Sequence, residues 1–165
     1  MGACLKDAFR IIQPIGFVVD FNDQWNYNYL LHRVDSNREK LKEFWLSVKY
    51  DWRPKIFVGP EKLRKASKWL RAEDMVLIPE DNAFDDSRRI LEELHTYNRP
   101  GSVFIFCGGM AAKYWMKELY LREPKITLID AGSSFDPLFC GQNRTYQMSW
   151  AECQAMYGDL DKYTV

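Results

Sequence analysis

Short runs of hydrophobic residues recur along the chain, and the stretches between them carry a different hydrophobic period. Each run is four to six residues long and rich in β-branched or aromatic side chains, which is typical of a buried strand. The run at 103–107 is the most hydrophobic. The pattern predicts five strands, at Ile15–Asp20, Lys55–Val58, Met75–Pro79, Val103–Cys107 and Ile126–Ile129.

Between these runs, hydrophobic residues recur every three or four positions, the spacing of one buried helix face. Ser36 and Glu39 fit a capping box, in which the two side chains satisfy free amides at a helix start. Pro60 suits the first turn of the next helix. The predicted buried faces are Leu41, Phe44, Trp45 and Val48; Leu63, Ala66 and Leu70; Ile90, Leu91 and Leu94; and Ala111, Trp115 and Leu119. A short helix is expected at Ala151–Tyr157.

Strands that alternate with helices indicate βαβ units around a parallel sheet. Right-handed crossovers then place helices on both sides of that sheet. We therefore expect an α/β, Rossmann-like fold, with residues 1–165 forming a single domain. A chain of 165 residues that is 47% hydrophobic is long enough for one real core.

Polar loops follow the predicted strands, and the carboxyl ends of parallel strands meet at one edge of a sheet, where ligands bind. The loops are Gly59-Pro60, 80–82, 107–110 and 130–136. In the last of them, Asp130, Gly132, Ser133, Ser134 and Asp136 suit either a phosphate- or sugar-binding loop or an ordinary turn. Gly108 and Gly109 suit either phosphate contact or close helix packing, without a full dinucleotide or P-loop signature.

Several single residues also leave alternatives open. The amide of Asn82 is able to read a base or a sugar hydroxyl, or to cap the next helix. Trp25 and Trp52 lie outside the clear helices and are candidates for stacking on a sugar or base. His95 lies near a helix end, where a cation is favourable.

Charge and cysteine content narrow the function classes. The chain has 23 lysines and arginines against 23 aspartates and glutamates, which argues against a nucleic-acid partner. No run is long enough for a membrane span, and the start lacks the hydrophobic core of a signal peptide. The four cysteines show no C-x-x-C pair, so we expect no metal finger and a reducing, cytoplasmic location.

Four blocks, in order, resemble glycosyltransferases of the GT-D type from bacteria and viruses. The blocks are IFVGPEKL, VLIPEDNAFDD, VFIFCGGMAAKYW and LIDAGSSFDPLFCGQNR, which together cover roughly residues 55–147. The resemblance implies transfer of a sugar from a nucleotide-sugar donor to a glycan or protein acceptor in glycan biosynthesis. A UDP-sugar is the expected donor, with Mn²⁺ or Mg²⁺ as a candidate cofactor and a homo-oligomer or a larger glycan-assembly system as candidate partners.

The resemblance also implies roles for individual residues. Asp136 would be a catalytic base or the metal ligand, and Asp130 would orient its loop. Arg144 would hold the donor diphosphate, because a guanidinium presents a fixed fork of donors. The donor cleft would be lined by Gly59, Pro60, Asn82, Gly108, Gly109, Gly132, Ser133, Ser134 and Arg144.

One departure from the family pattern leaves a second function open. Members carry an acidic motif near an early strand, and this chain contains no Asp-x-Glu. It therefore fits a compact or truncated version, or a non-catalytic module that binds a nucleotide-sugar for a glycan-assembly system. A methyltransferase-like domain that binds S-adenosylmethionine is a third reading, although the usual first-strand glycine motif is missing.

Overall fold

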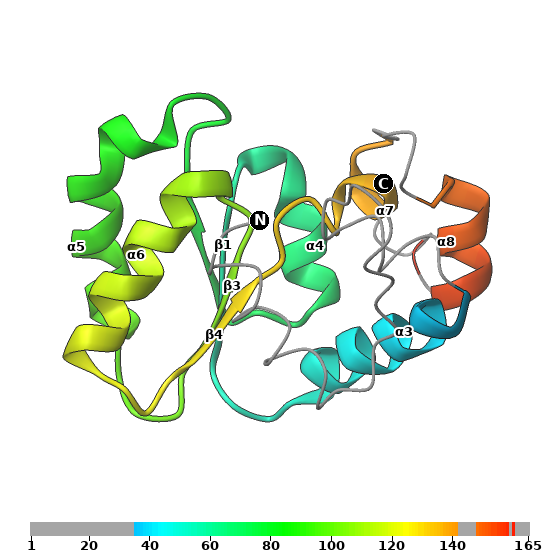
Figure 1. The fold of residues 1–165 in the computed structure, drawn as a ribbon, viewed down its shortest axis with the longest axis horizontal. Coiled ribbons are helices and arrows are strands. Elements are labelled where there is room, and N and C mark those ends of the chain that lie inside the picture. The colour runs from blue at the N-terminus through cyan, green and yellow to red at the C-terminus, as the bar shows by residue number, and fades with distance from the viewer. Residues whose placement is uncertain (1–34, 142–147, 159, 161–165) are drawn as a thin grey trace, which may run out of the picture.

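Four parallel strands form the centre of the computed structural model, which describes residues 35–141, 148–158 and 160 (Figure 1). The strand order is β2-β1-β3-β4, and every neighbouring pair is parallel. Phe57 in β1 lies opposite Met75 in β2 and Ile105 in β3. The strands are β1 (Lys55–Gly59), β2 (Asp74–Leu77), β3 (Val103–Phe106) and β4 (Thr127–Asp130).

Helices cover both faces of this sheet, which confirms the predicted α/β, Rossmann-like architecture. Helices α5 and α6 pack on one face, and α3, α4, α7 and α8 lie on the other (Figure 1). Two 3₁₀ turns, η2 and η3, follow β1 and β2. The bounds are α3 (Asp35–Tyr50), η2 (Glu61–Leu63), α4 (Arg64–Trp69), η3 (Ala83–Asp86), α5 (Ser87–Tyr97), α6 (Gly109–Arg122), α7 (Asp136–Phe139) and α8 (Trp150–Tyr157).

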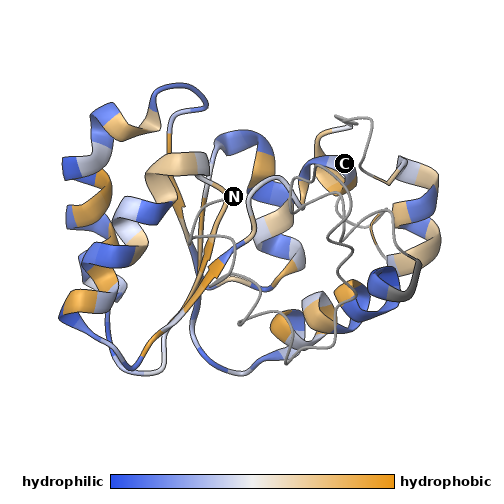
Figure 2. Ribbon diagram, in the orientation of Figure 1, coloured by the Kyte–Doolittle hydropathy of each residue, from blue (hydrophilic) through white to orange (hydrophobic). Residues whose placement is uncertain are grey.

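Alternate residues of each central strand belong to two separate cores. Phe57 of β1 belongs to the core under α3 and α4, whereas Ile56 and Val58 belong to the core under α5 and α6. Both faces of the strands are therefore apolar, and Figure 2 shows them as mainly hydrophobic. A fully buried side chain of this size stabilises the fold by about 1.5–3 kcal/mol relative to an exposed one.

The helix faces predicted from the sequence are confirmed, with most of their residues buried. Leu91 and Phe44 are only partly covered. Helix α8 gains a capping box that the sequence reading missed: the Ser149 hydroxyl accepts from the Glu152 amide, and the Ser149 amide donates to the Glu152 carboxylate. The strand predicted at Ile15–Asp20, Trp25, Arg144 and the side chain of Ser36 lie outside the described residues.

All four described strands differ from their predicted bounds by one or two residues: β1 ends at Gly59 rather than Val58, and β3 ends at Phe106 rather than Cys107. Strand β2 runs from Asp74 to Leu77 rather than from Met75 to Pro79. The amide of Ile78 still donates to the Gly59 carbonyl at 3.2 Å, but proline has no N–H with which to extend the ladder. Strand β4 is shifted by one residue and ends at Asp130, which lies opposite Phe106.

The order of the strands creates a switch point between β1 and β3. The chain leaves β1 for α4 on one face of the sheet, and it leaves β3 for α6 on the other face. The loops after β1 and β3 therefore turn away from each other at the carboxyl edge. In open α/β sheets, this divergence forms the crevice in which ligands bind.

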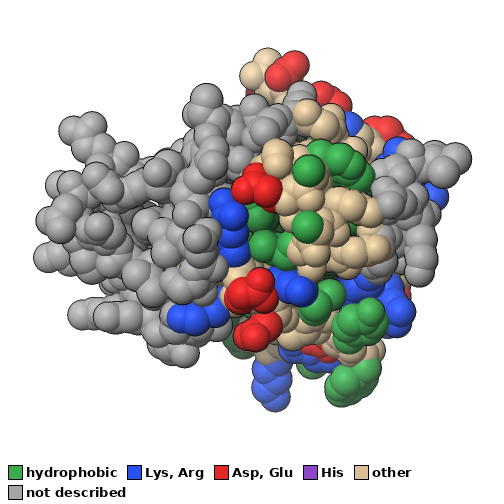
Figure 3. Space-filling view, turned by 90° about the vertical axis from the view of Figure 1, so that its right-hand side faces the viewer, with side chains coloured by type: hydrophobic (Ala, Val, Ile, Leu, Met, Phe, Trp, Pro, Cys, Tyr) green, Lys and Arg blue, Asp and Glu red, His purple; other side chains and the backbone are tan. Residues whose placement is uncertain are grey.

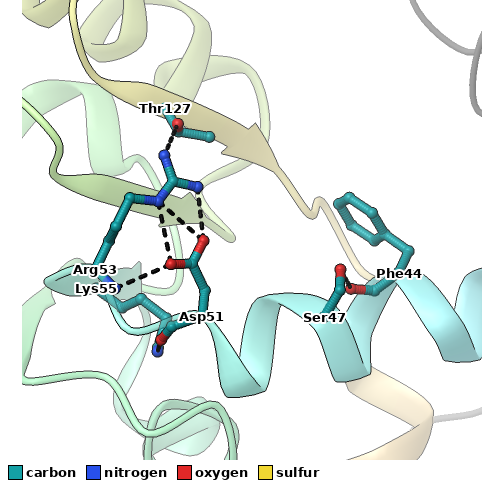
Figure 4. A network of polar contacts seen from close by, with 6 residues as sticks. All are labelled: Phe44, Ser47, Asp51, Arg53, Lys55 and Thr127. Atoms are coloured by element: carbon teal, nitrogen blue, oxygen red, sulfur yellow. Dashed lines mark hydrogen bonds and ion pairs between the residues drawn. The ribbon is translucent and has the colours of Figure 1, made fainter.

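At the opposite, amino edge, where the strands begin, polar side chains form hydrogen bonds with one another (Figure 4). Asp51 accepts two hydrogen bonds from Nε of Arg53 and one from Nη2, and Nη1 of Arg53 donates to the Thr127 hydroxyl at 2.9 Å. These bonds tie the approach to β1 to the start of β4. The bond to Arg53 lowers the pKa of Asp51, and burial lowers the pKa of Lys55.

Helices α3 and α8 form the side of the molecule shown in Figure 3, where acidic and basic side chains lie among hydrophobic ones. Arg38 and Glu152 join these helices through an ion pair of 3.3 Å. Among the helices that the structure describes, none is long and apolar enough to cross a membrane.

Candidate functional site

A cavity of about 330 Å³ opens at the carboxyl edge, next to the switch point. Its walls come from the residue after β1, the loop after β2 and the turn between β3 and α6. This is the edge at which the sequence predicts the ligand loops to meet. The lining residues are Pro60, Ile78, Pro79, Glu80, Asn82, Ala83, Phe84, Cys107, Gly108, Gly109, Met110 and Ala111.

The two glycines before α6 have different roles. A Cβ atom on Gly108 would lie 2.8 Å from a ring carbon of Trp115, so this position needs glycine for helix packing. Gly109 has a φ of +56°, and nothing lies within 4 Å of a Cβ built there. Packing thus accounts for Gly108, while Gly109 leaves the start of α6 open to the cavity, with no side chain capping that helix.

Asn82 lines the cavity from the loop after β2. It has a left-handed backbone, with φ of 50°, and occupies the N-cap position of η3 without a capping bond from its side chain. Its carbonyl accepts from the Asp85 amide at 2.9 Å. The capping role that the sequence left open is therefore not filled by the amide group, which remains available at the cavity.

Hydrophobic side chains stand exposed at the rim of the cavity. Phe84 is 56% exposed and Met110 84% exposed, although both are large and apolar. The Phe84 ring lies 5.4 Å from the ring of Tyr114, which projects from α6. The sequence reading missed this rim, although apolar residues within otherwise polar loops were the available signal.

Among the described residues that line the cavity, Glu80 is the only one with a carboxylate. Its Oε2 accepts from the Lys62 ammonium at 3.1 Å, which joins the loop after β2 to η2. This hydrogen bond raises the pKa of Lys62, and the nearby charge of Asp136 adds to the effect. The sequence reading did not select Glu80 as a site residue; its place directly after a predicted strand was the signal.

The loop of residues 130–136 closes on itself as a turn. The Gly132 amide donates to the Asp130 carboxylate at 3.1 Å, and Asp130 also forms an ion pair with Lys113 of α6. Phe135 is fully buried, with its ring 4.6 Å from that of Trp45. None of Gly132, Ser133 and Ser134 is among the residues that line the cavity, and Ser134 is buried.

Asp136 begins α7 and lies beside the cavity rather than in its lining. Burial raises the pKa of Cys140 to about 11, and the charge of Asp136 contributes to that rise. The same two causes raise the pKa of Cys107, which lines the cavity. These thiols are therefore protonated at neutral pH and are poor nucleophiles.

The structure thus brings Pro60, Asn82, Gly108 and Gly109 together from the predicted site residues. Gly59 ends β1, where a Cβ atom would lie 2.7 Å from the Phe57 ring, so its role is packing. Trp52 is 90% exposed but precedes β1, which places it at the amino edge, away from the cavity. Within residues 35–141, 148–158 and 160, no group of three or more His, Cys, Asp or Glu side chains is placed to hold a metal.

The described residues form an α/β fold with helices on both faces of a parallel sheet and a cavity next to its switch point. No protein-family model matches the chain, and no similar curated protein or solved structure was found. The functional proposal therefore rests on the fold and on the residues of the cavity.

Proposed function

We propose that this chain is a glycosyltransferase that binds a nucleotide-sugar donor in the cavity at the switch point. One observation carries the proposal: the cavity is lined by residues from three of the four sequence blocks that resemble GT-D glycosyltransferases. The three blocks are separate in the sequence and share no local motif; they come together because the parallel strands end at one edge of the sheet. Pro60, Asn82 and Gly109 represent the three blocks.

The donor diphosphate is assigned to the N-terminal end of α6. This helix has 14 residues and begins at Gly109, directly at the cavity. The first amides of a helix lack partners within the helix, and its dipole favours an anion there. A volume of about 330 Å³ lies at the lower end of the range for small-ligand sites.

In the proposed reaction, a hydroxyl oxygen of the acceptor forms a bond to the anomeric carbon of the sugar. The bond between that carbon and the diphosphate oxygen breaks, and its electron pair leaves with the nucleoside diphosphate. The acceptor proton passes to a carboxylate and then to water. Among the described residues that line the cavity, Glu80 alone offers a carboxylate; these residues do not fit a metal held by the protein, and no step is assigned to one.

A second candidate is a module that binds the nucleotide-sugar without transferring the sugar. It is favoured by the positions of the two aspartates that the resemblance assigns to catalysis. Asp130 is engaged by Lys113 and by the Gly132 amide, and Asp136 is not part of the cavity lining. Both candidates predict donor binding, and only the first predicts release of nucleoside diphosphate.

The test is thermal unfolding of the purified chain with UDP-, GDP-, CDP- and dTDP-sugars, followed by chromatography of released nucleoside diphosphate. We expect one nucleotide-sugar to raise Tm, because a ligand at a hundred times its Kd stabilises the folded state by about 2.7 kcal/mol. Binding with release supports the transferase, and binding alone supports the module. A rise in Tm with S-adenosylmethionine alone would contradict both candidate functions. So would an unchanged Tm with every nucleotide-sugar tested.

A further inference from the structure

Sugar transfer needs a group that takes the proton of the acceptor hydroxyl, and the described part of the cavity offers one carboxylate for it. Glu80 lines the cavity, and its side chain is 54% exposed, so an acceptor or water is able to reach it. Carboxylates are ionised at neutral pH and act as general bases when they lie within hydrogen-bond distance.

The backbone on both sides of the Glu80–Lys62 bond is held by β1. The Ile78 amide donates to the Gly59 carbonyl, which fixes the start of the loop that carries Glu80. The Leu63 amide donates to the Pro60 carbonyl at 2.9 Å, which fixes η2 and therefore the backbone of Lys62. Lys62 donates to Oε2, so the bond orients the carboxylate and leaves Oε1 outside that bond.

The two aspartates nearby are less well placed. Asp130 accepts from the Gly132 amide with one oxygen and pairs with Lys113 through the other. The charge of Asp136 helps to raise the pKa of Cys107, but Asp136 is absent from the cavity lining. Glu80 is therefore the carboxylate that lines the cavity and keeps one oxygen outside its bond to Lys62.

We infer that Glu80 is the general base of the transfer and that Lys62 is its positioning residue. The inference deepens the proposed glycosyltransferase function and rests on it. The acceptor hydroxyl gives its proton to a Glu80 oxygen while its own oxygen bonds to the anomeric carbon. The bond to the diphosphate breaks, the nucleoside diphosphate leaves with the electron pair, and Glu80 returns the proton to water.

The experiment measures release of nucleoside diphosphate by the full chain from whichever nucleotide-sugar the binding panel selects, with water as the acceptor. Glu80→Gln keeps the size of the side chain and removes the base. We expect kcat to fall about 100-fold or more, in the range measured for loss of a general base, with donor Kd changed less than about threefold.

Glu61→Gln is the matched control, because Glu61 is also an exposed carboxylate in an ion pair, with Arg64, and it does not line the cavity. Glu61→Gln should leave kcat unchanged. Lys62→Met should lower kcat about tenfold, and Lys62→Arg should restore most of it, because a cation again orients Glu80. A merely structural role of Lys62 would leave kcat unaffected once the variant is folded.

The outcomes separate the inference from the function on which it rests. If the native chain binds no donor, both the proposed function and the role of Glu80 are contradicted. If it binds the donor but releases no nucleoside diphosphate, the binding module stands and Glu80 is not a general base. Release that persists at the native rate in Glu80→Gln overturns the role of Glu80 while the transferase stands. A 100-fold loss in Asp136→Asn, with little loss in Glu80→Gln, would assign the base to Asp136 instead.

Discussion

Both edges of the sheet carry polar loops, but their side chains are engaged to different extents. At the amino edge, Asp51, Arg53 and Thr127 satisfy one another and tie β1 to β4 (Figure 4). At the carboxyl edge, Asn82 caps no helix with its side chain, and Gly109 leaves space open beside it. The comparison teaches that polar residues engaged with each other mark structure, whereas uncommitted ones beside a cavity mark a candidate site.

The largest expected loss of stability comes from adding a side chain at Gly108, the closely packed glycine at the carboxyl edge. Gly108→Val would place methyl groups into the space held by Trp115 and Ile78, and overpacking should cost about 2–3 kcal/mol. Gly101→Ala, in the turn before β3, has open space around its Cβ and only a backbone cost of about 1 kcal/mol. Urea unfolding measures both; equal losses would contradict the packing role of Gly108.

The second largest expected loss of stability comes from breaking the polar contacts at the amino edge. Arg53→Ala removes the bonds to Asp51 and Thr127, and we expect a loss of about 1 kcal/mol, because solvent partly screens the ion pair. Donor binding should not change. Arg64→Ala, which breaks the exposed pair with Glu61, is the control and should lose less.

Arg53→Ala should also change how the stability of the fold depends on pH. The folded-state pKa of Asp51 lies below its ordinary value of 3.8, so its stabilisation is present above that value and is lost as pH falls through the folded pKa. Arg53→Ala should therefore show a weaker loss of stability in acid than the native chain. An unchanged acid profile would contradict the coupling of Asp51 to Arg53.

The smallest effect concerns His95, near the C-terminal end of α5 and hence on the amino-edge side. Burial lowers its pKa below the ordinary 6.5, and its Nδ1 is buried without a hydrogen-bond partner among the described residues. The unfolded chain therefore binds more protons as pH falls through about 6.5, and stability should decrease there. His95→Gln should flatten this decrease in unfolding curves taken between about pH 8 and 5; an identical slope would refute it.

Much of the described fold could be predicted because each element follows a local pattern. Leu41, Trp45 and Val48 fall on one helix face in the sequence and are buried in α3. The end of β2 was misplaced by two residues because a hydrophobic run does not reveal where hydrogen bonding stops. His95 lies in the last turn of α5, as predicted, but burial lowers its pKa, and burial depends on the packing of α5 rather than on position in the helix.

The site was predictable only in part. Parallel strands bring Pro60, Asn82 and Gly109 to one edge, and topology alone is enough to predict this. The loop with the most suggestive residues, 130–136, turned out to be a closed turn anchored by Phe135, which contacts Trp45 from far along the chain. Such a contact has no local signal, and neither has the bond between Lys62 and Glu80, which are 18 residues apart.

The central claim is that the start of α6 binds the donor diphosphate, and a pair of glycine variants tests it most directly. Gly109 and Gly101 both have positive φ and open space for a side chain, but Gly101 lies at the amino edge. Gly109→Asp places a negative charge where the diphosphate is proposed to bind. The measurement is titration calorimetry of both variants with the nucleotide-sugar that stabilises the native chain. The account predicts that Gly109→Asp loses binding at least tenfold while Gly101→Asp binds as the native chain does; equal affinities would contradict it.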